Sequence, residues 1–241
     1  MDISNYKEEN IIREIDHGVE GKVYLYNDNG NKVALKIFYT GKGYNTNDNK
    51  ELKLKILKNE AILKDDMKLL NRMYSMGKFI GYTSLYEPYT PITYFDSNEK
   101  KIEFLQSLLK RVQELNSHGI YIGDFCPNNF GFENHKIKLY DIDNFRIDNL
   151  NFNISDNSMA EYMRKCKNIK NIDYFCFNWF AFSLLSKIKT STLLEGNYSS
   201  IPRNLKTDEI EDFFYDLKHI NDSYVIEEKD GKPKTLLNLL K

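Results

Sequence analysis

Two carboxylates and one amide lie close together in the second half of the chain. Asp124 precedes Asn129 by five residues, and Asp141 follows Asp124 by seventeen, directly after the apolar-leaning run 137–140. We expect these side chains to converge from neighbouring turns. Oxygen donors arranged in this way hold Mg²⁺ against a nucleotide phosphate and orient a hydroxyl group. The fold must therefore join these turns and supply a phosphate cradle and a lysine from upstream.

Composition excludes several classes of protein. The chain has 241 residues with 41% hydrophobic content, enough for the core of one domain or one two-lobed unit. Its 34 basic and 35 acidic residues give a net charge of −1, so we expect no nucleic-acid partner. The longest apolar-leaning run, Tyr174–Leu185, is too short and too polar for a membrane span, and no signal peptide is visible.

Cysteine usage bears on the compartment. Cys126, Cys166 and Cys176 form no CxxC pair, which argues against a zinc site or a disulfide scaffold and favours a reducing compartment. We expect the protein to act in the cytoplasm, or in a host cytoplasm if it is a secreted effector.

The first third of the chain has the composition of a β-rich unit. Strands are predicted at Ile11–Ile15, Lys22–Tyr26 and Lys32–Phe38, and Asp28-Asn-Gly30 is predicted as the hairpin turn between the last two. Apolar spacing predicts a helix over Lys50–Asn71, and one or two short strands are expected within Phe79–Glu87.

Helical patterns dominate after Ser97. The expected elements are helices at Glu99–His118, Ile172–Lys187, Asp208–His219 and Thr235–Leu240, with two short strands around Phe130 and over Ile137–Tyr140. The predicted fold class is α+β with two lobes. A small β-rich lobe with one helix covers about 1–88, and a reduced, mainly helical lobe covers about 89–241.

The upstream phosphate-binding parts occur in order. Gly18 and Gly21 lie in a turn between two strands, where glycine lets the backbone approach phosphate oxygens; an ordinary hairpin turn is the alternative. Alternation directs Ala34, Lys36 and Phe38 to one face of a mostly apolar strand. A lysine there costs free energy unless it meets an anion, although an edge lysine facing solvent is also compatible. Glu60, on the following predicted helix, is the natural carboxylate to hold it.

These motifs together resemble the protein-kinase-like superfamily over about Ile11 to Leu185. Asp16-His-Gly18-Val-Glu-Gly21-Lys-Val23 resembles its glycine-rich loop, and Val33-Ala-Leu-Lys36 resembles the strand that carries its phosphate-binding lysine. Glu60 resembles the ion-pair partner of that lysine, with Glu51 as a weaker candidate. Leu85–Tyr89 resembles the hinge that binds adenine.

The second half of the resemblance contains the polar residues named first. Asp124-Phe-Cys-Pro-Asn-Asn129 resembles the catalytic loop, and Asp141-Ile-Asp143 lies where D-F-G is expected. Asp173 resembles the buried aspartate at a helix start that braces the catalytic loop.

The resemblance implies that ATP, with Mg²⁺ or Mn²⁺, is the phosphoryl donor. Asp124 would orient the acceptor hydroxyl and take its proton, Lys36 would neutralise phosphate charge, and Asn129 and Asp141 would ligate the metal. The residues expected around the nucleotide are Gly18, Gly21, Val23, Ala34, Lys36, Glu60, Glu87 and Tyr89.

Four departures from the family pattern bear on the acceptor. Ile122-Gly123 replaces His-Arg, so we expect no switch by activation-loop phosphorylation; a Gly-Asp pair is also similar to small-molecule kinases of the aminoglycoside and choline type. Cys126 stands where Ser/Thr kinases place a phosphate-contacting lysine. Asp143 replaces the D-F-G glycine, either to face the metal or to stiffen the turn. No A-P-E segment is recognisable within 144–171.

Three functions follow from these motifs. The first is an atypical Ser/Thr protein kinase that transfers the γ-phosphoryl group to a hydroxyl of a protein substrate. The second is a pseudokinase that serves as a binding or scaffold module. The third keeps the fold but phosphorylates a small-molecule acceptor or transfers AMP.

Overall fold

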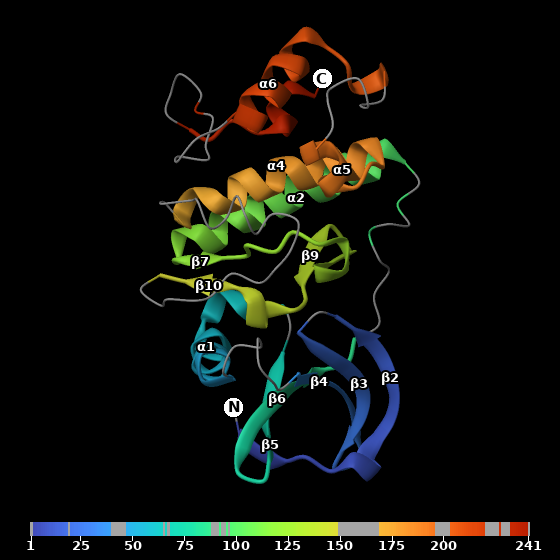
Figure 1. Ribbon diagram of the computed structural model, residues 1–241, viewed down its shortest axis with the longest axis vertical. Helices are drawn as coiled ribbons and strands as arrows, with labels where there is room; N and C mark the ends of the chain where they lie inside the picture. The colour runs from blue at the N-terminus through green and yellow to red at the C-terminus, as the bar shows by residue number, and fades with distance from the viewer. Residues whose placement is uncertain are drawn as a thin grey trace. The chain divides into compact units, whose positions relative to one another are not determined.

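The computed structural model describes residues 2–18, 20–39, 47–64, 66, 68–87, 92, 95, 97–148, 169–195, 203–219, 227 and 232–240, with backbone only at 47–49, 169–170 and 204. The fold is α+β, with a six-stranded mixed sheet and five α-helices in these ranges (Figure 1). The chain divides into two compact units, Met1–Tyr89 with Lys138–Asp143, and Thr90–Ile137 with Asn144–Lys241. The segment Lys138–Asp143, expected in the C-terminal lobe, therefore belongs to the N-terminal unit.

The N-terminal unit is built on one sheet with the strand order β1-β5-β6-β4-β3-β2. All neighbouring strands are antiparallel except β1 and β5, which run parallel. The strands are β1 Asp2–Asn5, β2 Ile11–His17, β3 Gly21–Asp28, β4 Asn31–Phe38, β5 Leu69–Ser75 and β6 Lys78–Leu85, with a short 3₁₀ turn η1 at Glu8–Asn10. The predicted strands β2, β3, β4 and β6 are confirmed, whereas β1 and β5 were not expected.

Tight turns set the register of this sheet. Asn29 and Gly30 both have positive φ, 52° and 90°, which is the geometry of a type I′ hairpin turn and confirms the turn predicted there. Met76 and Gly77, with φ of 49° and 75°, join β5 to β6 in the same way. Both turns match the right-handed twist of the strands that they connect.

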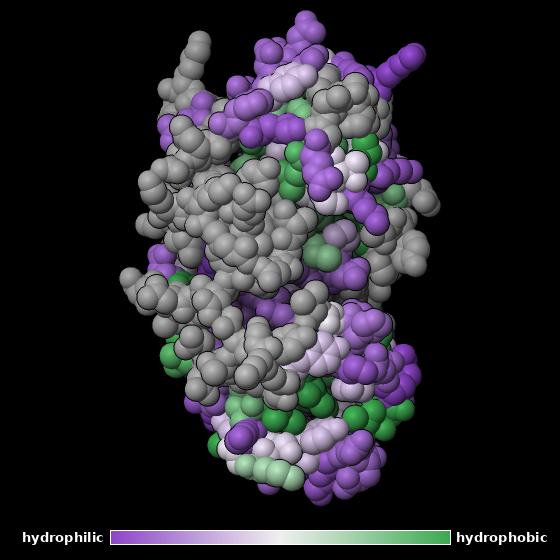
Figure 2. Space-filling model, in the orientation of Figure 1, coloured by the Kyte–Doolittle hydropathy of each residue, from purple (hydrophilic) through white to green (hydrophobic). Residues whose placement is uncertain are grey.

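The sheet has one apolar face and one face with charged groups. The apolar face packs Tyr26, Val33, Leu35 and Met73 into a buried cluster. Lys36 alternates with Val33 and Leu35 along β4 and therefore lies on the other face. Green patches over this unit in Figure 2 mark apolar side chains that reach the surface, and the exposed ones in the described ranges are Ile3, Ile12, Leu52, Met76 and Leu85.

Helix α1, Asn47–Asn59, packs against β5 and β6 through the fully buried Leu54 and Leu57. The expected helix over Lys50–Asn71 is wrong in its second half. The helix ends at Asn59, a 3₁₀ turn η2 follows at Ala61–Leu63, and the chain enters strand β5. Pairing of β5 with strands on both sides overrides the helical spacing of its leucines.

The C-terminal unit is mainly helical. Its helices are α2 Asn98–Ser117, α4 Ile169–Ser186, α5 Thr190–Glu195 and α6 Asp208–His219, with 3₁₀ turns η4 Pro127–Asn129, η7 Arg203–Leu205 and η8 Leu236–Leu239. Strands β7 Ile120–Tyr121 and β10 Arg146–Ile147 pair with each other. Strands β8 Phe130–Glu133 and β9 Lys136–Leu139 form a second pair, and η5 Ile142–Asn144 follows β9. The part of this stretch from Lys138 to Asp143 belongs to the N-terminal unit.

Helices α2 and α4 lie side by side and are the centre of this unit (Figure 1). Ser97 caps α2 by accepting a hydrogen bond from the backbone N–H of Lys100, and Gly119, with φ of 70°, ends it as predicted. Aromatic rings fill the core in edge-to-face and tilted pairs, among them Trp179 with Phe214. The predicted helices α2, α4 and α6 are confirmed, whereas 236–239 is a 3₁₀ turn. No helix in the described ranges is long and apolar enough to cross a lipid bilayer.

Candidate functional site

Strand β4 presents Lys36 on the polar face of the N-terminal sheet. Opposite Lys36 lie Val23 on β3 and Tyr82 on β6, so these three side chains share a face. The strands are held close by Gly81, because a Cβ at this position would lie 1.9 Å from the backbone oxygen of Lys36. Gly81 thus allows β6 to approach the backbone of Lys36 closely, a role that the sequence analysis did not identify.

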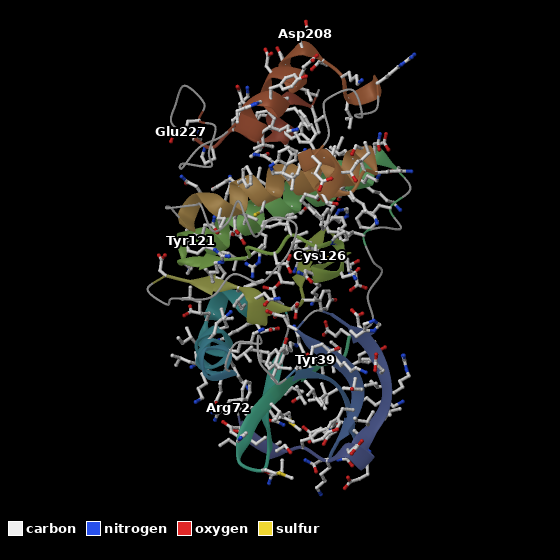
Figure 3. All side chains as sticks on the ribbon, viewed as in Figure 1. Tyr39, Arg72, Tyr121, Cys126, Asp208 and Glu227 are labelled. Carbon is white, nitrogen blue, oxygen red and sulfur yellow. The ribbon has the colours of Figure 1, made fainter. Side chains whose placement is uncertain are left out.

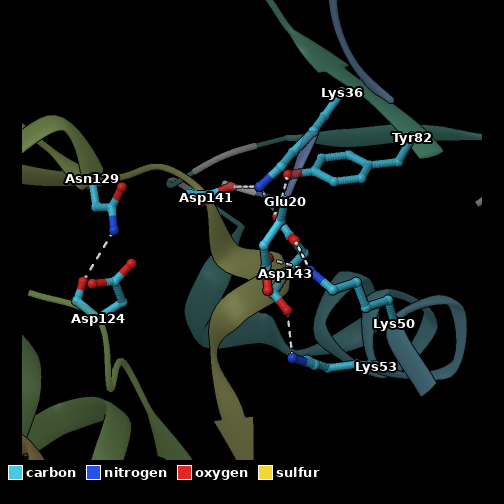
Figure 4. A network of polar contacts seen from close by, with 9 residues as sticks. All are labelled: Glu20, Lys36, Lys50, Lys53, Tyr82, Asp124, Asn129, Asp141 and Asp143. Carbon is cyan, nitrogen blue, oxygen red and sulfur yellow. Dashed lines mark hydrogen bonds and ion pairs between the residues drawn. The ribbon is translucent and has the colours of Figure 1, made fainter. Parts of the chain in front are cut away.

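Lys36 meets two carboxylates that are more than a hundred residues away in the sequence. Its ammonium group donates to Asp141 and, at 2.9 Å, to Oδ1 of Asp143 (Figure 4). Burial acts to lower the pKa of Lys36, but the charges of Asp141 and Asp143 outweigh burial and raise it. Lys36 is therefore a permanent cation with an anionic partner, and the alternative of a solvent-facing edge lysine is excluded.

Asp141 follows β9 in a left-handed backbone conformation, with φ of 55°, which aspartate tolerates better than most residues. Its side chain remains 29% exposed beside Lys36. Burial and the neighbouring charge of Asp143 raise its pKa, and Lys36 partly offsets this effect. Asp141 thus keeps a carboxylate that a cation from solvent can reach.

Asp143 is the centre of this cluster, with a fully buried side chain. Its Oδ1 accepts hydrogen bonds from Lys36 and from the hydroxyl of Tyr82, at 2.9 Å each, and its Oδ2 accepts from Lys50 at 2.9 Å. Lys53 donates to its backbone oxygen. Burial acts to raise the pKa of Asp143, but Lys36 and Lys50 hold it well below its usual range. In this structure Asp143 anchors three cations, a role that neither sequence alternative included.

Glu60 is not the partner of Lys36, contrary to prediction. Helix α1 ends before Glu60, whose backbone N–H bonds to Leu57 and begins η2. The weaker candidate, Glu51, pairs instead with Arg72 at 2.6 Å and with Lys55 at 2.8 Å. The carboxylate expected from the helix is supplied by Asp143, and the helix supplies lysines in its place.

The two glycines of the β2–β3 turn differ in how much space surrounds them. A Cβ on Gly21 would lie 2.3 Å from the backbone oxygen of Ile37, so Gly21 is required for the approach of β3 to β4. A Cβ on Gly18 would meet nothing within 4 Å. The N–H of Gly18 bonds to the oxygen of Gly21 at 2.9 Å, which closes the turn. Open space at Gly18 is compatible with a ligand there, whereas Gly21 has a structural role.

The other residues expected around the nucleotide are only partly described. Ala34 is half-buried, pairs with Leu25 across the strands and shares the face of Lys36. Glu87 follows β6 and lies 3.6 Å from the ammonium group of Lys138. Tyr89 lies outside the described residues, as does Cys166.

In the C-terminal unit, Asp124 and Asn129 belong to one closed loop. The backbone N–H of Asp124 bonds to Ile122 at 2.8 Å, and that of Asn129 bonds to Cys126 at 2.9 Å. The side-chain Nδ2 of Asn129 donates to the backbone oxygen of Asp124 at 3.0 Å (Figure 4). Cys126, labelled in Figure 3, is a half-buried cysteine in this loop and forms no disulfide bond. The prediction that Asp124 and Asn129 lie together is confirmed.

Asp173 holds this loop from α4. Its two carboxylate oxygens accept the backbone N–H groups of Ile122, at 2.9 Å, and Gly123, at 2.8 Å. Gly123 has φ of 68°, which directs its N–H at Asp173 and favours glycine at this position. Burial raises the pKa of Asp173 to about 6, although the two N–H groups and the charge of Arg146 act to lower it. The predicted bracing role of Asp173 is thus confirmed.

Asn129, in the C-terminal unit, offers one side-chain oxygen of the kind that magnesium prefers. The N–H side of the Asn129 amide is used inside the loop, and in the described part of the chain its Oδ1 accepts no hydrogen bond. Amide and carboxylate oxygens are hard ligands, and in the N-terminal unit Asp141 offers such an oxygen. No group of three or more His, Cys, Asp or Glu side chains suited to a metal occurs in the described ranges.

Sequence comparison adds no relative. No family model matches the chain, and no curated protein resembles it significantly. Sequence patterns did not single out four residues that belong to the lysine–carboxylate cluster or lie next to it: Lys50, Lys53, Tyr82 and Gly81. The signal for the lysines was present, because Lys50 and Lys53 lie on one side of α1, but their mixture with glutamates is typical of a solvated helix face.

Proposed function

We propose that this protein is an ATP-dependent phosphotransferase with a compact, two-lobed, kinase-like fold, and foremost an atypical Ser/Thr protein kinase. The observation that carries the proposal is the pairing of Lys36 with Asp141. Lys36, in a mostly apolar strand, donates to a carboxylate that follows another strand 105 residues further along the chain. Phosphoryl transfer requires such a pair, one to neutralise phosphate and the other to hold its metal.

Each polar residue has a role in this proposal. Lys36 would bind the α- and β-phosphates. Asp141 would be a magnesium ligand, Asn129 keeps the metal-ligand role that the resemblance implies, and the metal would supply positive charge against the phosphates. Asp124 orients the acceptor hydroxyl and receives its proton. Asp173 keeps Asp124 in position through the two N–H bonds to the loop. Such catalysis depends mainly on positioning and electrostatics, so these few groups suffice.

A labelled-phosphate experiment tests the function. The purified protein is incubated with Mg²⁺ or Mn²⁺ and with ATP labelled at the γ- or the α-position. Acceptors are the protein itself, a protein mixture, and hydroxylated small molecules of the aminoglycoside and choline type. We expect γ-label on a protein; γ-label on a small molecule, or α-label on any acceptor, indicates the small-molecule kinase or the AMP transferase.

Two variants identify the catalytic groups. Lys36→Met and Asp124→Asn should each lower transfer by about 100-fold or more, because each removes a group used in the transition state. Lys55→Met is the matched control, since Lys55 lies on the exposed side of α1 and its pairing with Glu51 leaves Lys36 untouched. Absence of transfer from both label positions with every acceptor contradicts the enzymatic proposal.

A nucleotide-binding pseudokinase is the second candidate. It is favoured by the closure of Lys36 on Asp141 and Asp143, which occupies the carboxylate needed for the metal. On this proposal the wild-type protein binds ATP without transferring phosphate, and Asp124→Ala preserves its biological activity. Loss of that activity in a folded Asp124→Ala variant rules this candidate out.

A further inference from the structure

Lys50 is a second buried cation beside the phosphate-binding lysine. Its ammonium group lies 2.9 Å from Oδ2 of Asp143, 2.5 Å from Oε2 of Glu20, and 4.5 Å from the centre of the Phe38 ring (Figure 4). Its side chain is only 15% exposed. A lysine on a helix at this depth, in contact with the glycine turn, is not explained by the function proposed above.

Lys50 and Lys36 are held by the same carboxylate. Oδ1 of Asp143 accepts from Lys36 and Oδ2 from Lys50, so the two ammonium groups flank one small anion. An anion that reaches Lys36 therefore also lies near Lys50. Phosphate oxygens are strong acceptors for such donors.

The two partners of Lys50 differ in how easily they are replaced. Asp143 is fully buried and bound by Lys36 and Tyr82 as well, so it is fixed. Glu20 lies in the turn with Gly18, its side chain is 26% exposed, and water can receive its carboxylate. Phosphate can take the place of Glu20 at Lys50 without leaving a buried charge unpaired.

We propose that Lys50 is a second phosphate-binding cation and that Glu20 occupies its ligand position until a nucleotide polyphosphate displaces it. The inference rests on the proposed function, because it assumes that a polyphosphate binds beside Lys36. The alternative is structural, with the Glu20–Lys50 pair serving only to tie the glycine turn to α1.

Two variants separate these alternatives because they act in opposite directions. Lys50→Met removes the cation and should weaken binding of Mg–ATP by about tenfold or more, whereas adenosine, which has no phosphate, should bind unchanged. Glu20→Gln removes the competing carboxylate and should tighten Mg–ATP binding by about twofold to fivefold. If the pair is only a structural tie, both variants loosen the turn and both weaken binding.

The affinities of Mg–ATP, inorganic tripolyphosphate and adenosine are measured by calorimetry, with Lys55→Met as the control on the same helix. Thermal unfolding without ligand shows whether each variant is folded, and Glu20→Gln decides the question if Lys50→Met is not. The inference fails, and the proposed function does not, if folded Lys50→Met binds Mg–ATP as tightly as the wild type or if Glu20→Gln binds it more weakly. If the wild type binds neither Mg–ATP nor tripolyphosphate, the proposed function and the inference both fail.

Discussion

Two aspartates, Asp143 in the N-terminal unit and Asp173 in the C-terminal unit, are both fully buried, yet their surroundings differ. Asp143 is bound by two ammonium groups and a tyrosine hydroxyl, whereas Asp173 is bound by two backbone N–H groups. Their pKa values move in opposite directions for this reason. Lysine charges hold that of Asp143 well below its usual range, while burial raises that of Asp173 to about 6.

The contrast distinguishes two ways of fixing a loop. In the C-terminal unit, the neutral N–H groups of Ile122 and Gly123 hold the backbone next to Asp124. The cluster at Asp143 instead joins charged side chains to one another. Under the proposed function, a polyphosphate would replace one ionic partner of this cluster, whereas the loop held by amide groups would keep Asp124 in position to orient a hydroxyl.

The largest effect is expected from Asp143→Ala. This change leaves the buried Lys36 and Lys50 without their shared partner, and should lower the free energy of unfolding by about 3–5 kcal/mol. Urea denaturation measures the change. Glu14→Ala is the control, because Glu14 pairs with Lys22 on the surface and should have no measurable effect. Equal loss in both variants would mean that the buried cluster is no more important to stability than a surface pair.

A smaller effect is expected from the matched change in the other unit, Asp173→Ala. It leaves two neutral N–H groups unsatisfied and should lower the free energy of unfolding by about 1–3 kcal/mol. If it costs more than Asp143→Ala, the distinction between charged and neutral partners is wrong.

The same variant gives a pH test. The folded protein binds the Asp173 proton more tightly than the unfolded chain does, because the pKa rises from 3.8 to about 6. The ionised carboxylate therefore costs stability above about pH 6, and that cost disappears as the pH falls towards 3.8. We expect the stability deficit of Asp173→Ala to grow as the pH falls through this interval and to be constant above it. A deficit that shrinks towards low pH contradicts the raised pKa.

The smallest effects are expected from a pair of tyrosines. Tyr82→Phe removes a buried hydroxyl that donates to Asp143 at 2.9 Å, and should cost about 1.5 kcal/mol. Tyr121→Phe removes the corresponding bond to Asp148, which is longer, at 3.2 Å, and partly exposed. It should cost less. Thermal unfolding of both variants compares them, and the reverse order would show that burial of the acceptor does not decide the strength of these bonds.

Local sequence patterns correctly predicted the strands and turns whose conformation depends mainly on their own residues. Strand alternation in β4 correctly gave the face of Lys36, and the positive φ required at Asn29 and Gly30 was readable from the Asn-Gly pair. The loop at Asp124 and its brace at Asp173 also followed from motif order. These features depend on short-range chemistry or on a shared pattern of motifs.

Predictions failed where the conformation or the ionic partner of a residue depends on residues far away in the sequence. Leu70 continues a helical spacing, but β5 is a strand because β1 and β6 pair with it. Glu60 is predicted as the partner of Lys36 because it is expected on the following helix and resembles the family's ion-pair carboxylate, whereas the actual second partner, Asp143, is 107 residues away. The residues next to Asp143 in the sequence do not show which role it has. They are equally compatible with stiffening a turn, binding a metal or forming the centre of an ion cluster.

The parallel pairing of β1 with β5 has a consequence for the order of folding. Asp2 pairs with Asn71 and Asn5 with Tyr74, so the first strand has no partner until the fifth has been synthesised. The β2–β3–β4 meander needs only local contacts and can form earlier on the ribosome. Closing the long loop between β1 and β5 then costs chain entropy late in folding. The edge of the sheet that is first in the sequence is thus expected to be the last to assemble.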